Sequence, residues 1–413
     1  MPSQKLPRSF SNLAWSNLAA QSAEQLSLAA APLVAVLALN AGPGEVGVLA
    51  AIQTLPFLLL SLPLGVVADR MPRRWIMLFG ETLRFVSLLA LMLMMVASSP
   101  NIAALSVLGF IGAVGTVGFS VAAPGMVASM VRREDLAQAN SRVELARSAA
   151  YAAGPAIAGA IVSWVGTSAV FGLATALSAT AIALLLRLSN PPAAPIGKKR
   201  NVLHEVAEGA AFVMGSALLR PILATGVIFN VSWFVLQAGY VPYAIHRLQL
   251  SPGAVGTTLS CYGVGMLAGA FCTSRIVRRI PLGRAIQLGP VAGVFAIASL
   301  AATLLLPSEW LAAICFFLMG AGPMVWTITT TTLRQNMTPD GMLGRVSAVF
   351  LTANTGARPL GALLGGLVGA TWGESACIVV ALAGFLIQAA VILFSEVASL
   401  RESDGRLGQR PAP

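Results

Sequence analysis

Two charged residues lie deep inside apolar stretches of the chain, where a charge is expensive. Glu24 lies about fifteen residues into the first stretch, and Arg358 about a dozen residues into one near the end. A charge at the centre of a membrane helix costs roughly 2.5 to 3.5 kcal/mol to insert, so such residues are functional candidates by default. Desolvation favours the neutral carboxyl, which allows Glu24 to exchange a proton at ordinary pH. We expect Glu24 to be the proton-coupling residue, the alternative being a structural carboxyl bonded within a bundle.

Arg358 directly precedes Pro359, and no acidic residue lies near it in the sequence. Its charge needs a partner, for which three candidates exist: Glu24, an anionic group of a substrate, or carbonyl groups freed by the proline. The choice stays open, and we include Arg358 among the expected substrate-binding residues.

Amide and aromatic side chains recur at helical spacing in the same stretches. Three amides spaced by four residues share one helix face beside Glu24, which we expect to meet water. A set in the second half recurs at steps of three and four residues. Rings supply apolar area and amides fix orientation for an amphiphilic ligand, unless these polar groups only hold helices together. The expected substrate-binding residues are Asn17, Gln21, Gln25, Asn230, Trp233, Gln237, Tyr240, Trp326 and Arg358.

Threonines follow Trp326 at positions 327 and 329 to 332. We expect some of these hydroxyls to face a transport path. The alternative for each is a hydrogen bond to the carbonyl one turn back, as most threonines in membrane helices make.

A small residue, an acid and a basic cluster share the segment 65–74, a tight turn after the second apolar stretch. Glycine allows close helix approach, the acid can pair with a base or cap the next helix, and the arginines can anchor to the lipid surface. Such a pairing, formed in only one state, would latch a gate. The expected gating residues are Gly65, Asp69, Arg70, Arg73, Arg74, Gly154 and Pro155.

Two further acid and base pairs stand one helical turn apart, Glu81 with Arg84 and Glu144 with Arg147. Residues at this spacing can neutralise each other on one helix face. We expect both pairs to be mainly structural, with a structural or gate-coupling role for the first rather than contact with a ligand.

An enzyme is not indicated, because His204 and His246 both fall between apolar stretches and no nucleophile is placed with a base. Phosphate-binding glycine loops are absent from the sequence, so ATP is not expected to drive the protein directly. All four cysteines fall within apolar stretches, which indicates packing rather than disulfides or a metal site. No cofactor is expected.

The composition indicates lipid as the solvent, since 57% of the 413 residues are hydrophobic and only 10% are charged. Blocks of about 20 apolar residues match the length of a membrane-crossing helix. Closed barrels are not indicated, because their strands alternate. Twelve helices are predicted, near 10–39, 44–68, 73–97, 101–130, 141–165, 168–188, 220–243, 253–277, 283–305, 310–336, 343–370 and 374–396.

Basic residues lie almost entirely on one side of this topology. Of the 26 Lys and Arg residues, all but Arg84, Arg147, Arg247 and Arg358 fall at the termini or in the loops on the terminal side. The positive-inside rule therefore places both termini in the cytoplasm. The net charge of +11 reports topology, and nucleic acid is not an expected partner.

The longest polar stretch divides the chain near its middle. We expect a first six-helix bundle over 1–188, a cytoplasmic linker with an amphipathic segment over 189–219, a second bundle over 220–396 and a cytoplasmic tail over 397–413. Arg142-Val143 before Gly154-Pro155 is echoed by Arg345-Val346 before Pro359-Leu360, about half the chain later. This spacing suits duplicated halves, although membrane helices rich in glycine and proline also match one another by chance.

The segment 65–74 resembles the loop between helices 2 and 3 of the major facilitator superfamily, with Pro72 where that family usually has glycine. Gly154, Pro155 and Gly159 are similar to part of the antiporter motif of drug exporters, without its upstream glycines. Further stretches resemble the subgroup of siderophore exporters and macrolide-efflux proteins. They are 123–127, 136–140, 154–159, 208–220, 344–346 and 359–361.

This resemblance implies an all-α integral membrane fold of twelve transmembrane helices in two pseudo-symmetric six-helix bundles, with helices 1, 4, 7 and 10 lining the cavity. It also implies export. We therefore expect a proton-coupled exporter of a small amphiphilic drug or siderophore, acting by alternating access as a monomer in the inner membrane. An importer of a small metabolite with the same fold, or a scaffold or enzyme without transport, remain the alternatives.

Overall fold

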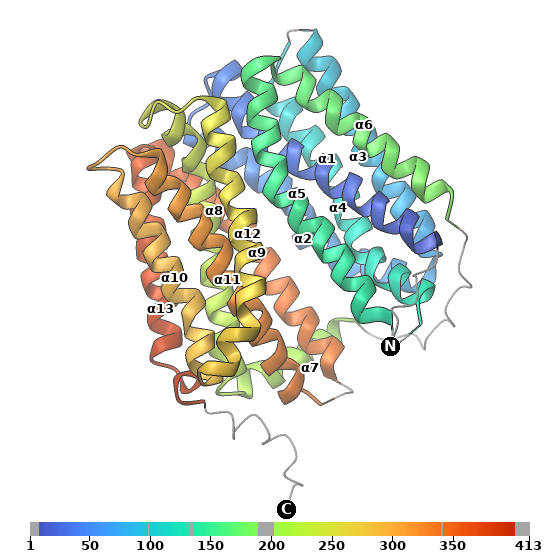
Figure 1. Ribbon diagram of the computed structural model, residues 1–413, viewed down its shortest axis with the longest axis vertical. Coiled ribbons are helices and arrows are strands. Elements are labelled where there is room, and N and C mark those ends of the chain that lie inside the picture. The colour runs from blue at the N-terminus through green and yellow to red at the C-terminus, as the bar shows by residue number, and fades with distance from the viewer. Residues whose placement is uncertain (1–7, 98, 133–134, 189–201, 340–341, 401–413) are drawn as a thin grey trace, which may run out of the picture. The chain divides into compact units, whose positions relative to one another are not determined.

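The computed structural model describes residues 8–97, 99–132, 135–188, 202–339 and 342–400, apart from the side chains of a few residues that include 68–70. The linker from 189 to 201 and the tail from 401 onward lie outside these ranges. Within them the chain is helical, with no strand (Figure 1).

Each of the twelve predicted membrane helices is present, and one shorter helix, α7, adds to them. The largest difference lies at α5, which begins at Leu136 where the sequence predicts a start near 141. The helices of the first half are α1 (Arg8–Leu39), α2 (Pro43–Arg70), α3 (Arg73–Val96), α4 (Ile102–Met130), α5 (Leu136–Trp164) and α6 (Thr167–Leu186). The others are α7 (Val202–Gly215), α8 (Leu219–His246), α9 (Pro252–Arg279), α10 (Leu282–Ala302), α11 (Glu309–Met337), α12 (Leu343–Trp372), α13 (Glu374–Leu393) and the short η3 (Glu396–Ser399).

Among the described helices, 11 are long and apolar enough to cross a membrane. The remaining long helix, α12, has 30 residues and could span by length. Arg345, Arg358 and its many glycines and threonines lower its hydropathy. The polar composition of α12 therefore marks a helix that does more than face lipid.

Turn chemistry ends the helices where the sequence places its polar breaks. Asn101 caps α4 by accepting a hydrogen bond from the Ala103 amide at 2.8 Å. Gly166 and Gly373 separate neighbouring helices with φ values of 108° and 82°, a conformation that glycine adopts without steric cost. Such short connections keep consecutive helices adjacent.

The chain forms two compact units, the first comprising 1–198 with 249–260 and the second 199–248 with 261–413. In unit 1, α1 packs on α5 and α6, and α3 packs on α4 and α6. In unit 2, α8 packs on α12 and α13, and α10 packs on α11 and α13. The two units therefore repeat one pairing scheme, in which the helix seven labels later matches each of α1, α3, α4, α5 and α6.

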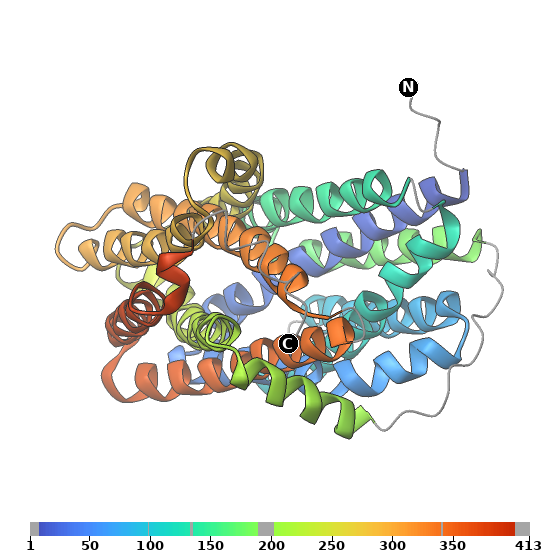
Figure 2. The ribbon, with the colours of Figure 1, turned by 90° about the horizontal axis from the view of Figure 1, so that it is seen from below.

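The helix α7 lies across the ends of the long helices of unit 2 (Figure 1). Its contacts are with α8 and α12, and Figure 2 views the molecule from this end. Arg345 near the start of α12 forms ion pairs with Glu205 and Glu208 of α7. A side chain at Gly209 would meet the Arg345 carbonyl at 2.7 Å, so glycine permits this close docking.

Candidate functional site

Glu24 and Arg84 form an ion pair at the centre of unit 1. Glu24 lies at the middle of the 32-residue α1, and Arg84 at the middle of the 24-residue α3, so both lie at mid-helix depth. Arg84 Nη2 is 3.8 Å from Glu24 Oε2, with side chains 5% and 16% exposed respectively. The sequence pairs Arg84 with Glu81 alone, and the structure corrects this interpretation.

Arg84 also holds its predicted partner. Its Nη1 donates to Glu81 Oε2 at 2.7 Å and to the Ala20 carbonyl at 3.1 Å, while Nη2 donates to Thr116 Oγ1 at 2.8 Å. Ser178 donates to Glu81 Oε1 at 2.6 Å. The predicted pair is therefore part of a wider cluster, which we call the central polar cluster and define as Glu24, Glu81, Arg84, Thr116 and Ser178.

A glycine crossing brings α4 within reach of this cluster. A side chain at Gly115 would lie 2.1 Å from the Gly80 carbonyl oxygen, and one at Gly80 would lie 2.6 Å from the Gly115 carbonyl oxygen. Only glycines allow backbones this close. The adjacent Thr116 can then bond the Arg84 guanidinium.

Two amides on the polar face of α1 lie against α5. Asn17 is 5% exposed and donates from Nδ2 to the Val143 carbonyl at 3.4 Å. Gln25 is also 5% exposed and packs against Gly154, where a side chain would lie 2.6 Å from Gln25 Cβ. Half-buried Gln21 and Glu24 lie on the same helix. The expected water-facing stripe is thus partly a packing surface, because Gly154 lets α1 approach α5.

In unit 2, Arg358 bonds a member of the predicted stripe of α8. Its Nε donates to Asn230 Oδ1 at 3.2 Å, and the guanidinium lies 6.0 Å from the Phe234 ring centroid. Asn230 Nδ2 donates to the Gly226 carbonyl at 2.9 Å, which fixes the orientation of the amide. The sequence foresaw neither the amide nor the ring as a partner, because it does not show how α8 and α12 are rotated.

The aromatic residues of the α8 stripe belong to a ring cluster. Trp233 stacks on Tyr262 at 5.2 Å and meets Phe316 edge to face at 5.9 Å, and Tyr240 meets Phe316 at 4.5 Å. Trp233 is 9% exposed and Tyr240 is fully buried, whereas Gln237 is half-buried. Tyr240 is therefore enclosed by protein in this conformation, and Trp233 packs within the same ring cluster.

Four of the five threonines that follow Trp326 on α11 make the hydrogen bond of the alternative interpretation. Thr327, Thr329, Thr330 and Thr332 each donate to a carbonyl four residues earlier, at 2.7 to 2.9 Å. Trp326 packs at the α10–α11 contact, where a side chain at Gly289 would lie 2.5 Å from its Cβ.

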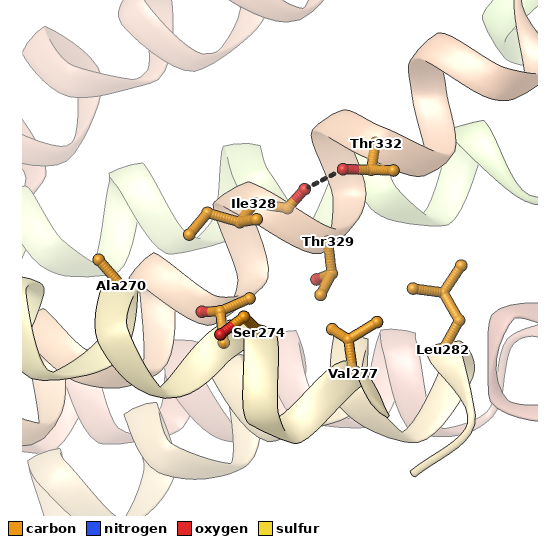
Figure 3. Close-up of a pocket in the computed structure, with 8 residues that line it drawn as sticks. Ala270, Ser274, Val277, Leu282, Ile328, Thr329 and Thr332 are labelled. Carbon is orange, nitrogen blue, oxygen red and sulfur yellow. Dashed lines mark hydrogen bonds between the residues drawn. The ribbon is translucent and has the colours of Figure 1, made fainter. Parts of the chain in front are cut away.

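A pocket of about 290 Å³ lies between α9 and α11 in unit 2 (Figure 3). Its lining combines apolar side chains with the hydroxyls of Thr273, Ser274, Thr329 and Thr332. Among the predicted substrate-binding residues, neither Arg358 nor the α8 stripe contributes to it. We therefore place the candidate site at the central polar cluster of unit 1 and at the Arg358–Asn230 contact of unit 2 rather than in this pocket.

Two basic residues of the 65–74 turn, Arg73 and Arg74, have backbone partners. Arg73 Nη1 donates to the Gly125 carbonyl at 2.7 Å, and Arg74 donates to the Leu185 and Leu186 carbonyls at 3.2 and 2.8 Å. The Arg74 bonds satisfy two carbonyl groups at the C-terminal end of α6, where a positive charge stabilises the helix. These arginines fasten α3 to its neighbours, where the sequence predicts lipid anchoring.

The other predicted gating residues are placed less completely. The nearest atom to a side chain built at Gly65 is Val121 Cγ1 at 4.0 Å, so this glycine is not forced by crowding. The side chains of Asp69 and Arg70 lie outside those that the structure describes. The predicted latch therefore remains a proposal.

Glycines of the predicted antiporter run contact the first turns of α9, within unit 1. A side chain at Gly159 would lie 2.4 Å from the Pro252 carbonyl oxygen, and one at Gly256 would lie 2.3 Å from the Pro155 carbonyl oxygen. The Ala156 amide donates to Ser260 Oγ at 2.7 Å. Gly154 faces α1, so the run brings three helices into close contact.

Arg84, Thr116 and Ser178 are candidate residues that sequence reasoning missed as part of the site. One usable signal was depth, since Arg84 lies as centrally in its helix as Glu24 does. Thr116 and Ser178 carried no distinguishing signal, because serines and threonines are common in membrane helices.

Long apolar helices in a repeated pairing scheme, with charges at their centres, define a polytopic membrane protein of the transporter class. The sequence model of the Major Facilitator Superfamily matches residues 13–362. The chain belongs to the major facilitator superfamily, as the 65–74 segment predicts. It is therefore a multi-pass membrane transporter of a small molecule and not an enzyme.

Relatives among characterised proteins include siderophore exporters. The enterobactin exporters EntS of Escherichia coli O1:K1 / APEC and of Shigella boydii serotype 18 are each 26% identical over 305 residues, which is 73% of this chain and 72% of the relative. This agrees with the predicted subgroup resemblance.

Solved structures with the same fold include a bacterial homologue of the iron transporter ferroportin in the inward-facing state. It has a TM-score of 0.76 at 18% identity and covers 96% of this chain and 100% of its own. The nucleoside transporter NupG has a TM-score of 0.75 at 12% identity, covering 93% and 98%. These similarities confirm the predicted all-α fold with two pseudo-symmetric halves.

Proposed function

We propose that this protein is a proton-coupled exporter of a small amphiphilic molecule, such as a drug or a siderophore, acting by alternating access. The observation that carries the proposal is Glu24, a half-buried carboxylate at the centre of α1 with Arg84 at 3.8 Å. Placing an ionisable group at this depth costs free energy, so such a residue is a functional candidate by default. Proton exchange at Glu24 is the use we assign to it.

Export rather than import is supported by the relatives. The enterobactin exporters match over nearly three quarters of their length. Their named substrate class guides the choice of test compounds, and an amphiphilic molecule suits the combination of amides, rings and a cation on α8 and α12.

Substrate contact in unit 2 is assigned to Asn230, Arg358 and Gln237, next to the ring cluster that contains Trp233. The guanidinium of Arg358 can bind an anionic or hydrogen-bond-accepting group, while Phe234 offers an aromatic face. Asp69 is proposed to latch a gate on the cytoplasmic side.

The distribution of basic residues supports an inner-membrane location with both termini in the cytoplasm. Nothing in the reaction requires a second copy of the chain, and we assign a monomer as the working unit. Protons entering the cell would drive the substrate outward.

A deletion strain tests function and direction together. The strain and its parent are grown with a panel of antibiotics and dyes, and siderophore is measured in the medium. Export predicts greater sensitivity to a panel compound or at least a tenfold loss of secreted siderophore, restored by the wild-type gene. Unchanged sensitivity and secretion, with reduced uptake of a nutrient instead, would favour import.

A further inference from the structure

Three ionisable side chains meet at the centre of unit 1, and their charges do not cancel in pairs. Two carboxylates, Glu24 and Glu81, approach one guanidinium, Arg84, at 3.8 and 2.7 Å. Fully ionised, these three residues carry a net charge of −1. A cluster of this composition at mid-helix depth is stabilised when one carboxyl takes up a proton.

The two carboxylates are held very differently. Glu81 is fully buried, and its two oxygens accept hydrogen bonds from Arg84 and Ser178 at 2.7 and 2.6 Å. Both of its oxygens are therefore occupied by donors. Glu24 is more exposed and lies farther from the guanidinium, so it is the carboxyl placed to exchange a proton.

The surrounding helices bring few other ionisable groups. Neither α4 nor α6 contains an acidic or basic residue within its bounds. On α5, Glu144 pairs with Arg147 at 2.7 Å, and on α2, Glu45 accepts from the Gly42 amide at 3.0 Å. The remaining charged residues of these helices lie near helix starts or ends; they are Arg8, Asp69, Arg70, Arg73, Arg74 and Arg142. The only other titratable side chain within the bounds of these helices is Tyr151 of α5.

We propose that Glu81 and Arg84 act as a fixed-charge pair that sets the proton affinity of Glu24. Arg84 stabilises ionised Glu24, and Glu81 offsets most of that effect by neutralising the guanidinium. The pair thereby keeps Glu24 able to take up and release a proton near working pH. This inference rests on the proposed role of Glu24. It gives a positioning role to Glu81 and Arg84, which the sequence predicts to be mainly structural.

The sign of the effect follows from the charges. Glutamine at position 81 keeps the shape but leaves the Arg84 charge to act on Glu24, so Glu24 should hold its proton only at lower pH. A cation within about 4 to 6 Å shifts a carboxyl by one to three pH units. Removing both charges of the pair should move the titration midpoint of Glu24 in the opposite direction.

The test is a pH titration of the purified full-length protein in lipid vesicles, followed by infrared difference spectroscopy of the protonated carboxyl band. Glu24→Gln identifies the part of the band that belongs to Glu24. Glu81→Gln should lower its midpoint by about one pH unit or more. The double variant Glu81→Gln, Arg84→Gln should raise it above the wild-type value.

Glu144→Gln is the matched control, because it removes the acid of another i, i+3 pair that lies on α5. It should leave the midpoint unchanged. The double variant provides a second test if the single variant misfolds, because removing both partners of a buried ion pair leaves neither of them as an uncompensated charge. If either folded variant leaves the midpoint in place, or both shift it the same way, the inference is overturned.

This outcome is separable from failure of the proposed function. A Glu24 band that follows the charge of the pair, together with unimpaired gradient-driven transport by Glu24→Gln, would remove Glu24 from coupling while leaving the electrostatic assignment intact. Loss of transport in Glu24→Gln without a midpoint shift in Glu81→Gln would do the reverse.

Discussion

At the scale of single residues, each unit presents one central charge in a different setting. Glu24 shares Arg84 with a second carboxylate, whereas Arg358 contacts the Asn230 amide and the Phe234 ring. A hydrogen bond to a neutral amide orients the guanidinium without adding a negative charge at that contact. We propose that the second unit recognises a hydrogen-bond-accepting or anionic group of the substrate.

Asn230→Asp changes this setting with almost no change of shape. A carboxylate 3.2 Å from Arg358 Nε would neutralise the guanidinium. For anionic compounds found in the strain panel, we expect KM to rise about tenfold, equivalent to about 1.4 kcal/mol. Cationic compounds should be transported as well as before or better. Initial rates of transport in membrane vesicles measure both.

Asn230→Ala separates lost charge from a lost hydrogen bond, because it removes the amide without adding an acid. Equal loss for anionic and cationic compounds in Asn230→Asp would show that Asn230 only supports packing. Sequence reasoning selected Asn230 and Arg358 separately. Their contact depends on the rotation of α8 against α12, which a one-dimensional pattern does not encode.

At the scale of helices, close crossings through glycine position the central polar cluster. Gly115 meets the Gly80 backbone, whereas a side chain at Gly118, one turn away, would find its nearest neighbours at 3.8 Å. Alanine favours a helix over glycine by roughly 0.5 to 1 kcal/mol at either position. The two positions therefore differ in packing alone.

We expect Gly115→Ala to destabilise the protein by about 1 to 3 kcal/mol, because the added methyl group forces α3 and α4 apart. Gly118→Ala should be neutral or slightly stabilising. Thermal unfolding of the purified proteins in detergent, followed by tryptophan fluorescence, compares them. Equal stability of the two variants would contradict the crossing described here.

Helix positions were predictable because apolar length and polar breaks are local features. The start of α5 was predicted too late because its first two turns mix polar with apolar residues. The partners of each helix were not predictable. Gln25 against Gly154, and Thr116 against Arg84, depend on which face of each helix turns inward. Helices such as α1 carry polar residues on several faces, so the sequence alone gave no unique orientation.

At the scale of the whole molecule, the chain repeats one helix-pairing scheme in two units while placing different chemistry in each. The internal echo around Pro155 and Pro359 predicts this duplication. The carboxyl cluster lies in unit 1, and the guanidinium with its amide and rings lies in unit 2. We infer a division of labour between proton exchange and substrate binding.

Gradient-driven transport in proteoliposomes tests this account most directly. Vesicles with an acidic interior contain either the wild-type protein or Glu24→Gln, and the probes are enterobactin, ethidium and erythromycin. Protons leaving the vesicle should drive at least one probe inward against its gradient with the wild-type protein. Glu24→Gln should reduce this accumulation at least tenfold. It should still exchange the probe across the membrane in the absence of a pH gradient. Accumulation by Glu24→Gln at the wild-type level would contradict the assignment of Glu24 as the coupling residue.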